Sequence, residues 1–337
     1  MKKIPLTILL VITLVNASRA QQITPNVELQ RQVHFILSNK LKPVDAINEQ
    51  VIIMDCKSGE IRAMVHLVNS KFGIKPTTSQ LSQPTGLMRP ISLLAALEKG
   101  KVNLNDSIDT KAGMLDINGY MLKDYNWLRG GNGKTSVRQG FLLSSNIATY
   151  LTVKQAFGKN YAQFHKMITD MGYGLPQDST KATSSIPDND ISLAKFVNGK
   201  NQQITPLQIL TFYNALANNG KMVKPTVHKN DTTIIKEQIA SKENIATIQQ
   251  LLIQKELTSK AFSDKVPIAG EQGVAVVKED GDNTIYCIQF CGYYPAKNPQ
   301  YSIIVTLNKQ GLPASGGLAG EVAKNIIRKY GNNYLHR

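Results

Sequence analysis

Two short segments have the spacing of known chemical motifs, and both are weak. Ser192 precedes Lys195 by three residues, so on a helix a lysine amine would lie one turn from a serine hydroxyl and could activate it as a nucleophile. A single match of this kind is expected by chance, and nothing around Ser192 resembles a reactive helix start. The segment from Gly130 to Thr135 is rich in glycine, but a phosphate-binding loop needs a glycine at the position of Leu128 and a strand before the loop. We interpret both segments as ordinary sequence without catalytic function.

The spacing of cysteine and histidine argues against disulfide and metal chemistry. The chain has only three cysteines, and Cys287 and Cys291 lie four residues apart in an expected strand. That spacing corresponds to about 13 Å, beyond disulfide reach. The five histidines are scattered without the spacing of metal ligands. The sequence therefore predicts no metal site and no cofactor.

Apolar residues at helical spacing predict the helices that would position any site. Leu29, Val33 and Leu37 indicate a first helix from about residue 27. Thr205, Pro206 and Gln208 form a capping box, in which Thr caps the helix, Pro occupies its first position and Gln its third. Helices are expected from about residue 27, at 91–98, at 206–217, around 245–252 and around 322–327.

Apolar runs at both ends of the chain predict one sheet. The runs 51–56 and 61–66 flank Gly59 and indicate a β-hairpin, and strands follow at 273–277, 284–290 and 301–307. These strands can join in one antiparallel sheet, with the first and last helices packed on it and a helical subdomain inserted in sequence. We therefore expect an α/β (α+β) fold with a five-stranded sheet. Its sheet part is expected from about 24–75 and 262–337, and its mostly helical part from about 76–261.

Composition and charge indicate an exported globular protein. The 337 residues are 42% hydrophobic, which excludes disorder, and 39 Lys and Arg against 24 Asp and Glu give a net charge of +15. Residues 1–20 have the cationic start, the apolar run and the small residues of a secretory signal peptide. Without them the mature chain keeps 36 cationic against 24 acidic side chains, a net charge of +12. We expect a periplasmic or cell-envelope location, no nucleic-acid partner, and membrane contact only if the signal is retained as an anchor.

Several segments together resemble the transpeptidase domain of penicillin-binding proteins, particularly the class B group. The resemblance rests on the opening strands VIIMDCKSGEIRAMV, the nucleophile helix SQPTGLMRPISLLAALEKG, the second motif GFLLSSNIATYL and the third-motif strand VPIAGEQGVAVV. Order and spacing agree over about residues 24–333. The resemblance implies the fold that this family shares with serine β-lactamases, and D,D-transpeptidase chemistry on peptidoglycan stem peptides.

The resemblance also identifies the positions of the family's three motifs, and two of them differ here. In the family, Ser-x-x-Lys supplies the nucleophile and the base, Ser-x-Asn positions protons and substrate, and Lys-Thr-Gly captures the terminal carboxylate. The corresponding positions are Gly86 with Arg89, the intact Ser144-Ser145-Asn146, and Glu271-Gln272-Gly273. Glycine has no side chain to acylate, and arginine stays protonated near neutral pH. Glu271 should repel a substrate carboxylate. No intact catalytic set is therefore expected.

The two charge changes predict a contact. In the family the two motif lysines lie close to the nucleophile, so Arg89 and Glu271 should face each other and form an ion pair where the catalytic serine would have been. A separation beyond about 6 Å would contradict this hypothesis. The alternative, that both side chains point to water, stays open. The backbone N–H groups of Gly86 and Val274 are candidates for an oxyanion-hole-like site, so weak carbonyl binding also stays open.

The leading interpretation is an exported, catalytically degenerate family member. It would hold peptidoglycan stem peptides or glycan strands weakly and noncovalently, or bind cell-wall synthesis or division proteins. The alternative is an active D,D-transpeptidase or carboxypeptidase with another nucleophile, Ser144 or Ser145, with Lys154 or Lys134 as the base for Ser144. A third interpretation, a β-lactam sensor or hydrolase, lacks the same serine. Covalent modification by a penicillin separates these interpretations.

Overall fold

The computed structural model describes residues 25–40, 46–69, 71–72, 81–176, 183–258, 268–312 and 314–330. The expected signal peptide, 1–20, lies outside these residues. The helices are α2 (Val27–Lys40), α3 (Met88–Glu98), α4 (Val137–Leu142), α5 (Asn146–Phe157), α6 (Tyr161–Asp170), α7 (Asp190–Val197), α8 (Pro206–Ala217), α9 (Lys242–Thr258) and α10 (Gly316–Tyr330), with the 3-10 turns η2 (Thr85–Leu87) and η3 (Trp127–Arg129). No described helix is long and apolar enough to cross a membrane.

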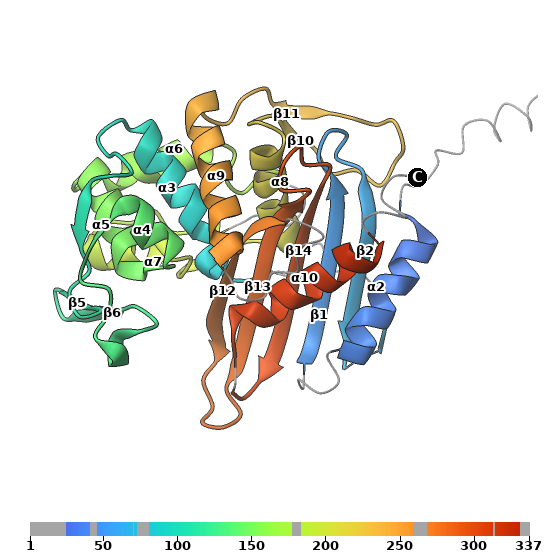
Figure 1. Cartoon of the computed structure of the whole chain (residues 1–337), viewed down its shortest axis with the longest axis horizontal. Helices are drawn as coiled ribbons and strands as arrows, with labels where there is room; N and C mark the ends of the chain where they lie inside the picture. The colour runs from blue at the N-terminus through green and yellow to red at the C-terminus, as the bar shows by residue number, and fades with distance from the viewer. Residues whose placement is uncertain are drawn as a thin grey trace, which may run out of the picture.

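The main sheet joins strands from the two ends of the chain, as predicted. Its strands are β1 (Ala46–Asp55), β2 (Ile61–Val68), β3 (Lys71–Phe72), β12 (Ala269–Lys278), β13 (Ile285–Tyr294) and β14 (Tyr301–Gln310). Their order is β12-β13-β14-β1-β2-β3, and every neighbouring pair is antiparallel. The five long strands are the expected ones, and the two-residue β3 extends the sheet at its β2 edge. Figure 1 shows the sheet with the helical part on one side.

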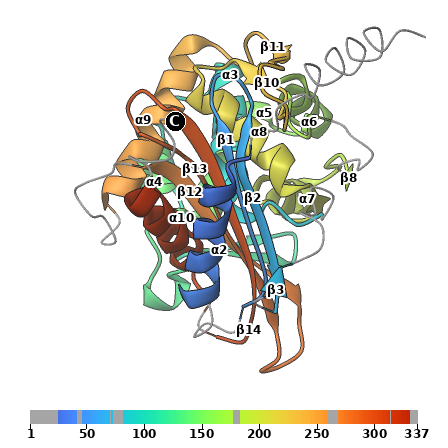
Figure 2. The same ribbon diagram turned by 90° about the vertical axis from the view of Figure 1, so that its right-hand side faces the viewer.

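Both faces of the sheet are buried, because a different layer covers each. Successive side chains of a strand point to opposite faces. In β1, Val51 and Ile53 therefore pack under α2 and α10, whereas Ile52 and Met54 face the helical part. We call these the outer and inner faces of the sheet. Figure 2 shows α2 and α10 side by side across the outer face. Burial on both faces explains why residues 51–54 of β1 are all apolar.

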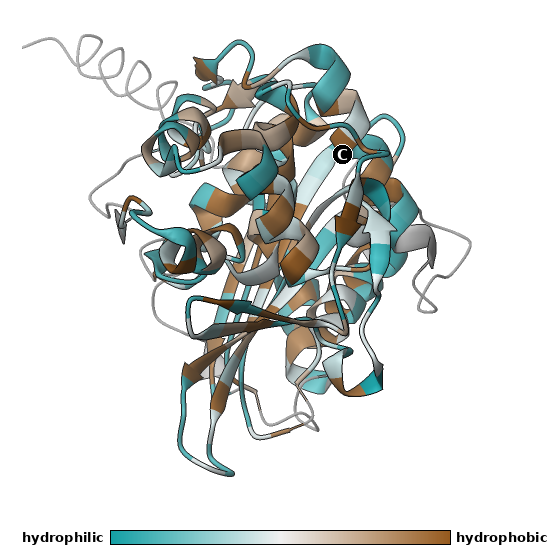
Figure 3. Ribbon diagram, turned by 90° about the vertical axis from the view of Figure 1, so that its left-hand side faces the viewer, coloured by the Kyte–Doolittle hydropathy of each residue, from teal (hydrophilic) through white to brown (hydrophobic). Residues whose placement is uncertain are grey.

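The helical part contains the expected helices and several short strands that were not predicted. The capping box at the start of α8 is formed as expected, with Thr205 and Gln208 bonding reciprocally. Between α3 and α9 lie four two-stranded sheets, formed by β4 (Ser107–Asp109) with β7 (Lys134–Ser136), β5 (Met114–Ile117) with β6 (Tyr120–Lys123), β8 (Thr183–Ser184) with β9 (Gln202–Gln203), and β10 (Met222–Val223) with β11 (Ile234–Lys236). The β5–β6 turn is Asn118-Gly119, both with positive φ, so this Asn-Gly pair was an available hairpin signal. In Figure 3 the helices carry both brown and teal segments, as amphipathic helices around a shared core do.

The three cysteines are buried and free in the structure. Burial raises the pKa of the Cys287 thiol to about 12. Burial also raises the pKa values of Cys56 and Cys291 well above the usual thiol range. These thiols therefore stay protonated and act as small apolar side chains.

Candidate functional site

The cleft is built where the turn before α3 meets the inner face of β12. Thr85 has a φ of +53° and is 2% exposed, and its Oγ1 lies 3.1 Å from the side-chain amide of Gln289 on β13. Gly273 lies directly against this turn, because a Cβ built on it would be 2.0 Å from Thr85 Oγ1 and 2.4 Å from Gly86 N. Strand and turn are thus in contact beside Gly86, the position predicted from the sequence for the nucleophile.

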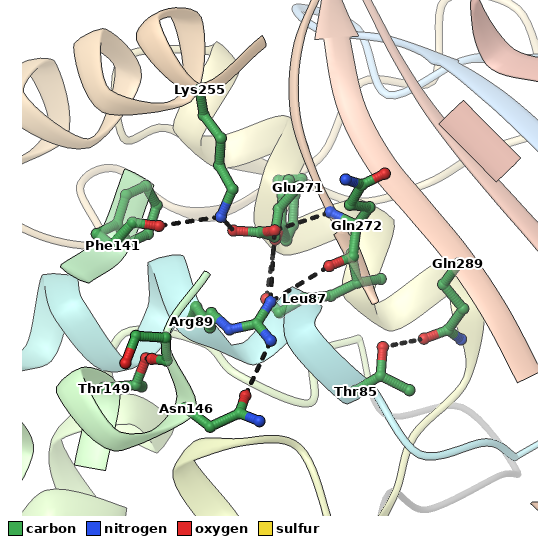
Figure 4. Close-up of polar contacts among 12 residues, drawn as sticks. Thr85, Leu87, Arg89, Phe141, Asn146, Thr149, Lys255, Glu271, Gln272 and Gln289 are labelled. Atoms are coloured by element: carbon green, nitrogen blue, oxygen red, sulfur yellow. Dashed lines mark hydrogen bonds and ion pairs between the residues drawn. The ribbon is translucent and has the colours of Figure 1, made fainter. Parts of the chain in front are cut away.

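The side chain of Arg89 fills the space beside Gly86. A Cβ built on Gly86 would lie 2.2 Å from Arg89 Nη1 and 2.5 Å from the carbonyl oxygen of Gln272. Arg89 Nη1 is 3.5 Å from Glu271 Oε1 and donates to Gln272 O at 3.4 Å, and Nη2 donates to Asn146 Oδ1 at 3.0 Å. Figure 4 shows the guanidinium between these three partners. The predicted ion pair between Arg89 and Glu271 is confirmed, and the alternative that both side chains point to water is wrong.

A second cation completes this cluster, and sequence reasoning missed it. Lys255 of α9 places its Nζ 2.5 Å from Glu271 Oε2 and 3.1 Å from Phe141 O. The side chain of Lys255 is 8% exposed and that of Glu271 is 0% exposed. One sequence signal was available, because Lys255 follows Leu251 by four residues and therefore lies on the apolar face of its helix. We call Arg89, Glu271 and Lys255 the charge cluster.

The charge cluster changes the expected electrostatics of the third motif. Glu271 accepts a hydrogen bond from the backbone N–H of Gln272 at 2.9 Å and is flanked by Arg89 and Lys255. The expected repulsion of a substrate carboxylate by Glu271 does not follow, because two cations offset its charge at short range. Arg89 and Lys255 each form an ion pair with Glu271, so their positive charges are also offset at short range. The cleft thus neither repels an anion strongly nor offers it a dedicated lysine.

The second motif has a structural role at the start of α5. Ser145 caps this helix: its Oγ accepts from Ala148 N at 2.9 Å and donates to Asp124 Oδ2 at 2.7 Å. Asp124 also accepts from Ile147 N at 3.1 Å and is 1% exposed. Asp124 is a second residue that sequence reasoning missed. Ser144, the residue before the cap, is half-buried and has a φ of +56°.

Asn146 connects the second motif to the charge cluster. Its amide nitrogen donates to Lys123 O at 2.9 Å, which leaves Oδ1 toward the Arg89 guanidinium. Asn198 Nδ2 donates to the Asn146 carbonyl oxygen at 3.2 Å. The structure therefore brings the positions of all three motifs together around Arg89.

The two lysines considered as bases for the alternative nucleophile make no hydrogen bond to Ser144 within the described ranges. Lys154, one candidate, forms an ion pair with Asp190 and lies 5.4 Å from the ring centroid of Tyr161. Lys134, the other, is exposed on β7. Ser145 is itself 0% exposed and held in the helix cap. The carbonyl-binding role of the Gly86 and Val274 amides stays a prediction.

The weak sequence motifs have ordinary structural roles. Ser192 is the third residue of α7 and forms a capping box with Asn189. Lys195 lies 5.0 Å from the ring centroid of Tyr120. Within the described ranges, no group of three or more His, Cys, Asp and Glu side chains is arranged to hold a metal.

Comparisons with known proteins agree with the geometry. A family model described as the penicillin binding protein transpeptidase domain matches residues 50–328. The chain is 26% identical over 272 residues to Stage V sporulation protein D of Bacillus subtilis, covering 73% of this chain and 41% of that protein. It is 22% identical over 363 residues to the peptidoglycan D,D-transpeptidase FtsI homolog of Mesostigma viride, covering 91% of this chain and 60% of that protein. The chain thus spans about half the length of these curated relatives.

A solved structure shows the same fold. The apo TP domain of penicillin-binding protein 3 from Burkholderia pseudomallei superposes with a TM-score of 0.76 at 18% identity. The match covers 94% of this chain and 98% of that one. The arrangement of sheet and helices is therefore shared over almost the whole length of both.

Proposed function

This chain belongs to the family of penicillin-binding protein transpeptidase domains, and we propose that it is a pseudoenzyme whose cleft binds without forming a covalent bond. In this proposal the chain is exported to the periplasm or cell envelope. It holds peptidoglycan stem peptides or glycan strands, or a protein of cell-wall synthesis or division. A relative named as a peptidoglycan D,D-transpeptidase supports peptidoglycan as the ligand class.

The arrangement of Gly86 and Arg89 carries the proposal. An acyl-enzyme needs a hydroxyl or thiol at the nucleophile position and a base beside it. Gly86 supplies no side chain, and the Arg89 guanidinium occupies the space into which one would project. A guanidinium cannot accept the nucleophile's proton near neutral pH. The nucleophile and the base are therefore both absent from this position.

The second support is that the remaining charged groups are already paired. In a transpeptidase the third-motif lysine has to be available to a substrate carboxylate. Here that position is Glu271, and both cations that reach it, Arg89 and Lys255, lie within 3.5 Å of its carboxylate. A buried cluster of this kind holds helices α3 and α9 to β12. Its role in the proposal is structural.

Intact-mass measurement after incubation with benzylpenicillin tests the proposal. We expect the unmodified mass, with an active transpeptidase of the same family acylated in parallel as the positive control. Co-sedimentation with purified, insoluble peptidoglycan tests whether the chain binds this polymer noncovalently. We expect the chain to sediment with it, and we expect less sedimentation at high salt because the chain is basic.

An adduct would contradict the pseudoenzyme proposal. If the adduct disappeared in the Ser144→Ala variant, the alternative of an active enzyme that uses Ser144 would replace it. No adduct together with no sedimentation would contradict peptidoglycan as the ligand and leave a protein of cell-wall synthesis or division as the proposed partner.

A further inference from the structure

A cavity of about 140 Å³ lies beyond the cleft, on the inner face of the sheet. Its floor is formed by β12, β13, β14 and β1, and its roof by residues 81–83 together with Gln203 and Pro206. We call it the sheet pocket. None of the motif positions lines it, so it is separate from the charge cluster.

Carboxamides dominate the polar lining of the sheet pocket. Five of its side chains end in an amide: Asn48, Gln50, Gln83, Gln203 and Asn308. None of the described residues that line it is charged, although the chain has a net charge of +15. A carboxamide donates through nitrogen and accepts through oxygen, so this lining matches ligand groups that do both, such as hydroxyls and amides. The uncharged lining among the described residues favours a neutral ligand over a carboxylate or phosphate.

One hydroxyl in the floor has no partner. Thr306 Oγ1 is buried and makes no hydrogen bond within the described part of the chain. A buried hydroxyl without a partner is unfavourable, and a ligand hydroxyl in the pocket would relieve this. On the edge strand, Val276 and Val277 also line the pocket and are 47% and 59% exposed. An exposed apolar surface beside amides suits a ligand with one apolar face and a polar rim.

We infer that the sheet pocket binds a neutral sugar ring, namely an N-acetylhexosamine residue of a glycan strand. A pyranose ring has apolar C–H faces and a rim of hydroxyls, and its N-acetyl group adds an amide. A cavity of about 140 Å³ is of a size to hold one ring. The inference rests on the proposed function, because it names the part of peptidoglycan that this chain holds.

Gln289 connects the sheet pocket to the cleft. With its amide nitrogen toward the roof, this side chain lies within 3.2 Å of Gln83 O and 3.1 Å of Thr85 Oγ1, and its oxygen accepts from Ser82 Oγ at 3.2 Å. Gln289 is 1% exposed, so it bridges the roof of the pocket and the turn that carries Gly86. A bound sugar would therefore contact the segment that leads directly into the cleft.

Titration calorimetry and ligand-observed NMR with N-acetylglucosamine and its neutral β-1,4-linked trimer test the inference. We expect saturable binding with a Kd on the order of 1 mM for the monosaccharide, because a ligand of this size gains only a few kcal/mol. Ala275→Phe fills the pocket and should weaken binding at least tenfold. Gln203→Leu, at an exposed position, should weaken it severalfold without unfolding the chain. Gln163→Leu, an exposed glutamine on α6, is the matched control and should bind like the wild type.

The outcomes separate this inference from the proposed function. Absence of sugar binding by a chain that still sediments with peptidoglycan would overturn the sheet pocket and leave the proposed function intact. Binding of a stem pentapeptide but not the trimer would also overturn it, and would favour a peptide site. Sugar binding that both Ala275→Phe and Gln203→Leu leave unchanged would place the site elsewhere and overturn the inference. Trimer binding without sedimentation would support the pocket and contradict peptidoglycan as the natural ligand.

Discussion

The two sides of the cleft differ in whether the predicted motif positions carry the residues expected of the family. On one side, the second motif keeps its residues, and Ser145 and Asn146 hold the start of α5 through Asp124 and Lys123. On the other side, the positions predicted for the first and third motifs carry Gly86, Arg89 and Glu271, and the charge cluster fills the space. The preserved side carries hydrogen bonds on which a helix start depends.

This difference indicates which motif residues can be replaced without a loss of folding stability. A residue that caps a helix and satisfies a buried carboxylate has a folding role, so its loss destabilises the chain whether or not catalysis occurs. A nucleophile or a substrate-binding lysine has no such role. Gly86, Arg89 and Glu271 are therefore compatible with a stable fold, provided that the charges introduced are paired.

Removal of Glu271 should have the largest effect on stability. Glu271→Ala leaves Arg89 and Lys255 close together in a buried site without their anion, so we expect a loss of about 3–5 kcal/mol in the free energy of unfolding. Urea denaturation measures this. The control is Glu237→Ala, which breaks an exposed pair with Lys221 and should change stability by less than about 1 kcal/mol. Equal effects of the two variants would show that the charge cluster is no more structural than a surface pair.

Replacement of the two neighbouring serines of the second motif by alanine should reduce stability by very different amounts. Ser145→Ala removes the helix cap and leaves Asp124 Oδ2 without its donor, so we expect a loss of about 2–3 kcal/mol. Ser144→Ala should change stability by less than about 0.5 kcal/mol, because Ser144 Oγ makes no hydrogen bond within the described part of the chain. Thermal unfolding of both variants makes the comparison. A large loss in Ser144→Ala would assign the structural role to the wrong serine.

The sequence predicts those parts of the site that depend on local patterns or on the family's motifs, and it misses contacts between elements that are far apart along the chain. The capping box of α8 and the antiparallel sheet follow from local patterns, and the Arg89–Glu271 pair follows from the aligned motif positions. Lys255 and Asp124 were missed because their contacts depend on how α9 and the end of β6 are oriented against distant elements. Local spacing does not specify this orientation. The positive φ of Thr85 was not predictable either, because threonine rarely adopts it.

Restoring a serine at position 86 tests whether Gly86 and Arg89 are coupled. In Gly86→Ser the new Cβ would clash with Arg89 Nη1, which can move, and with Gln272 O, which belongs to a strand and cannot move freely. We expect a loss of about 2 kcal/mol, partly recovered by adding Arg89→Lys. Chemical denaturation of the single and double variants measures the coupling. Additive effects would mean that the two positions changed independently.

The full reversion should still fail to restore acylation. The variant G86S/R89K/E271K introduces an ammonium beside Lys255, whose Nζ lies 2.5 Å from the present carboxylate. An ammonium at position 271 in place of the carboxylate would bring like charges together in a buried site, which opposes folding of the cleft. Adding Lys255→Met should recover stability, and intact-mass analysis with benzylpenicillin then shows whether acylation returns. Acylation of the triple variant without this change would show that Lys255 does not constrain the cleft.

Glu49 provides a final contrast with Glu271, because no ion pair is formed by its buried carboxyl within the described ranges. Glu49 lies on β1, is 1% exposed, and its Oε2 has no partner within the described ranges. Burial raises its pKa from 4.5 to about 7. The folded chain therefore binds more protons than the unfolded chain between these pH values. This contribution to stability is fully present below about pH 4.5 and is lost as pH rises toward 7, with a slope that approaches about 1 kcal/mol per pH unit.

Denaturation between pH 4.5 and 8 isolates this effect as the difference between the wild type and Glu49→Gln. The variant keeps a neutral side chain of the same shape, so it should lose this slope and become the more stable protein above pH 7. The matched control, Glu279→Gln at an exposed position, should follow the wild type. Parallel curves for Glu49→Gln and the wild type would show that Glu49 is paired or hydrated in solution. A carboxylate on this sheet could then stay ionised without flanking cations such as those beside Glu271.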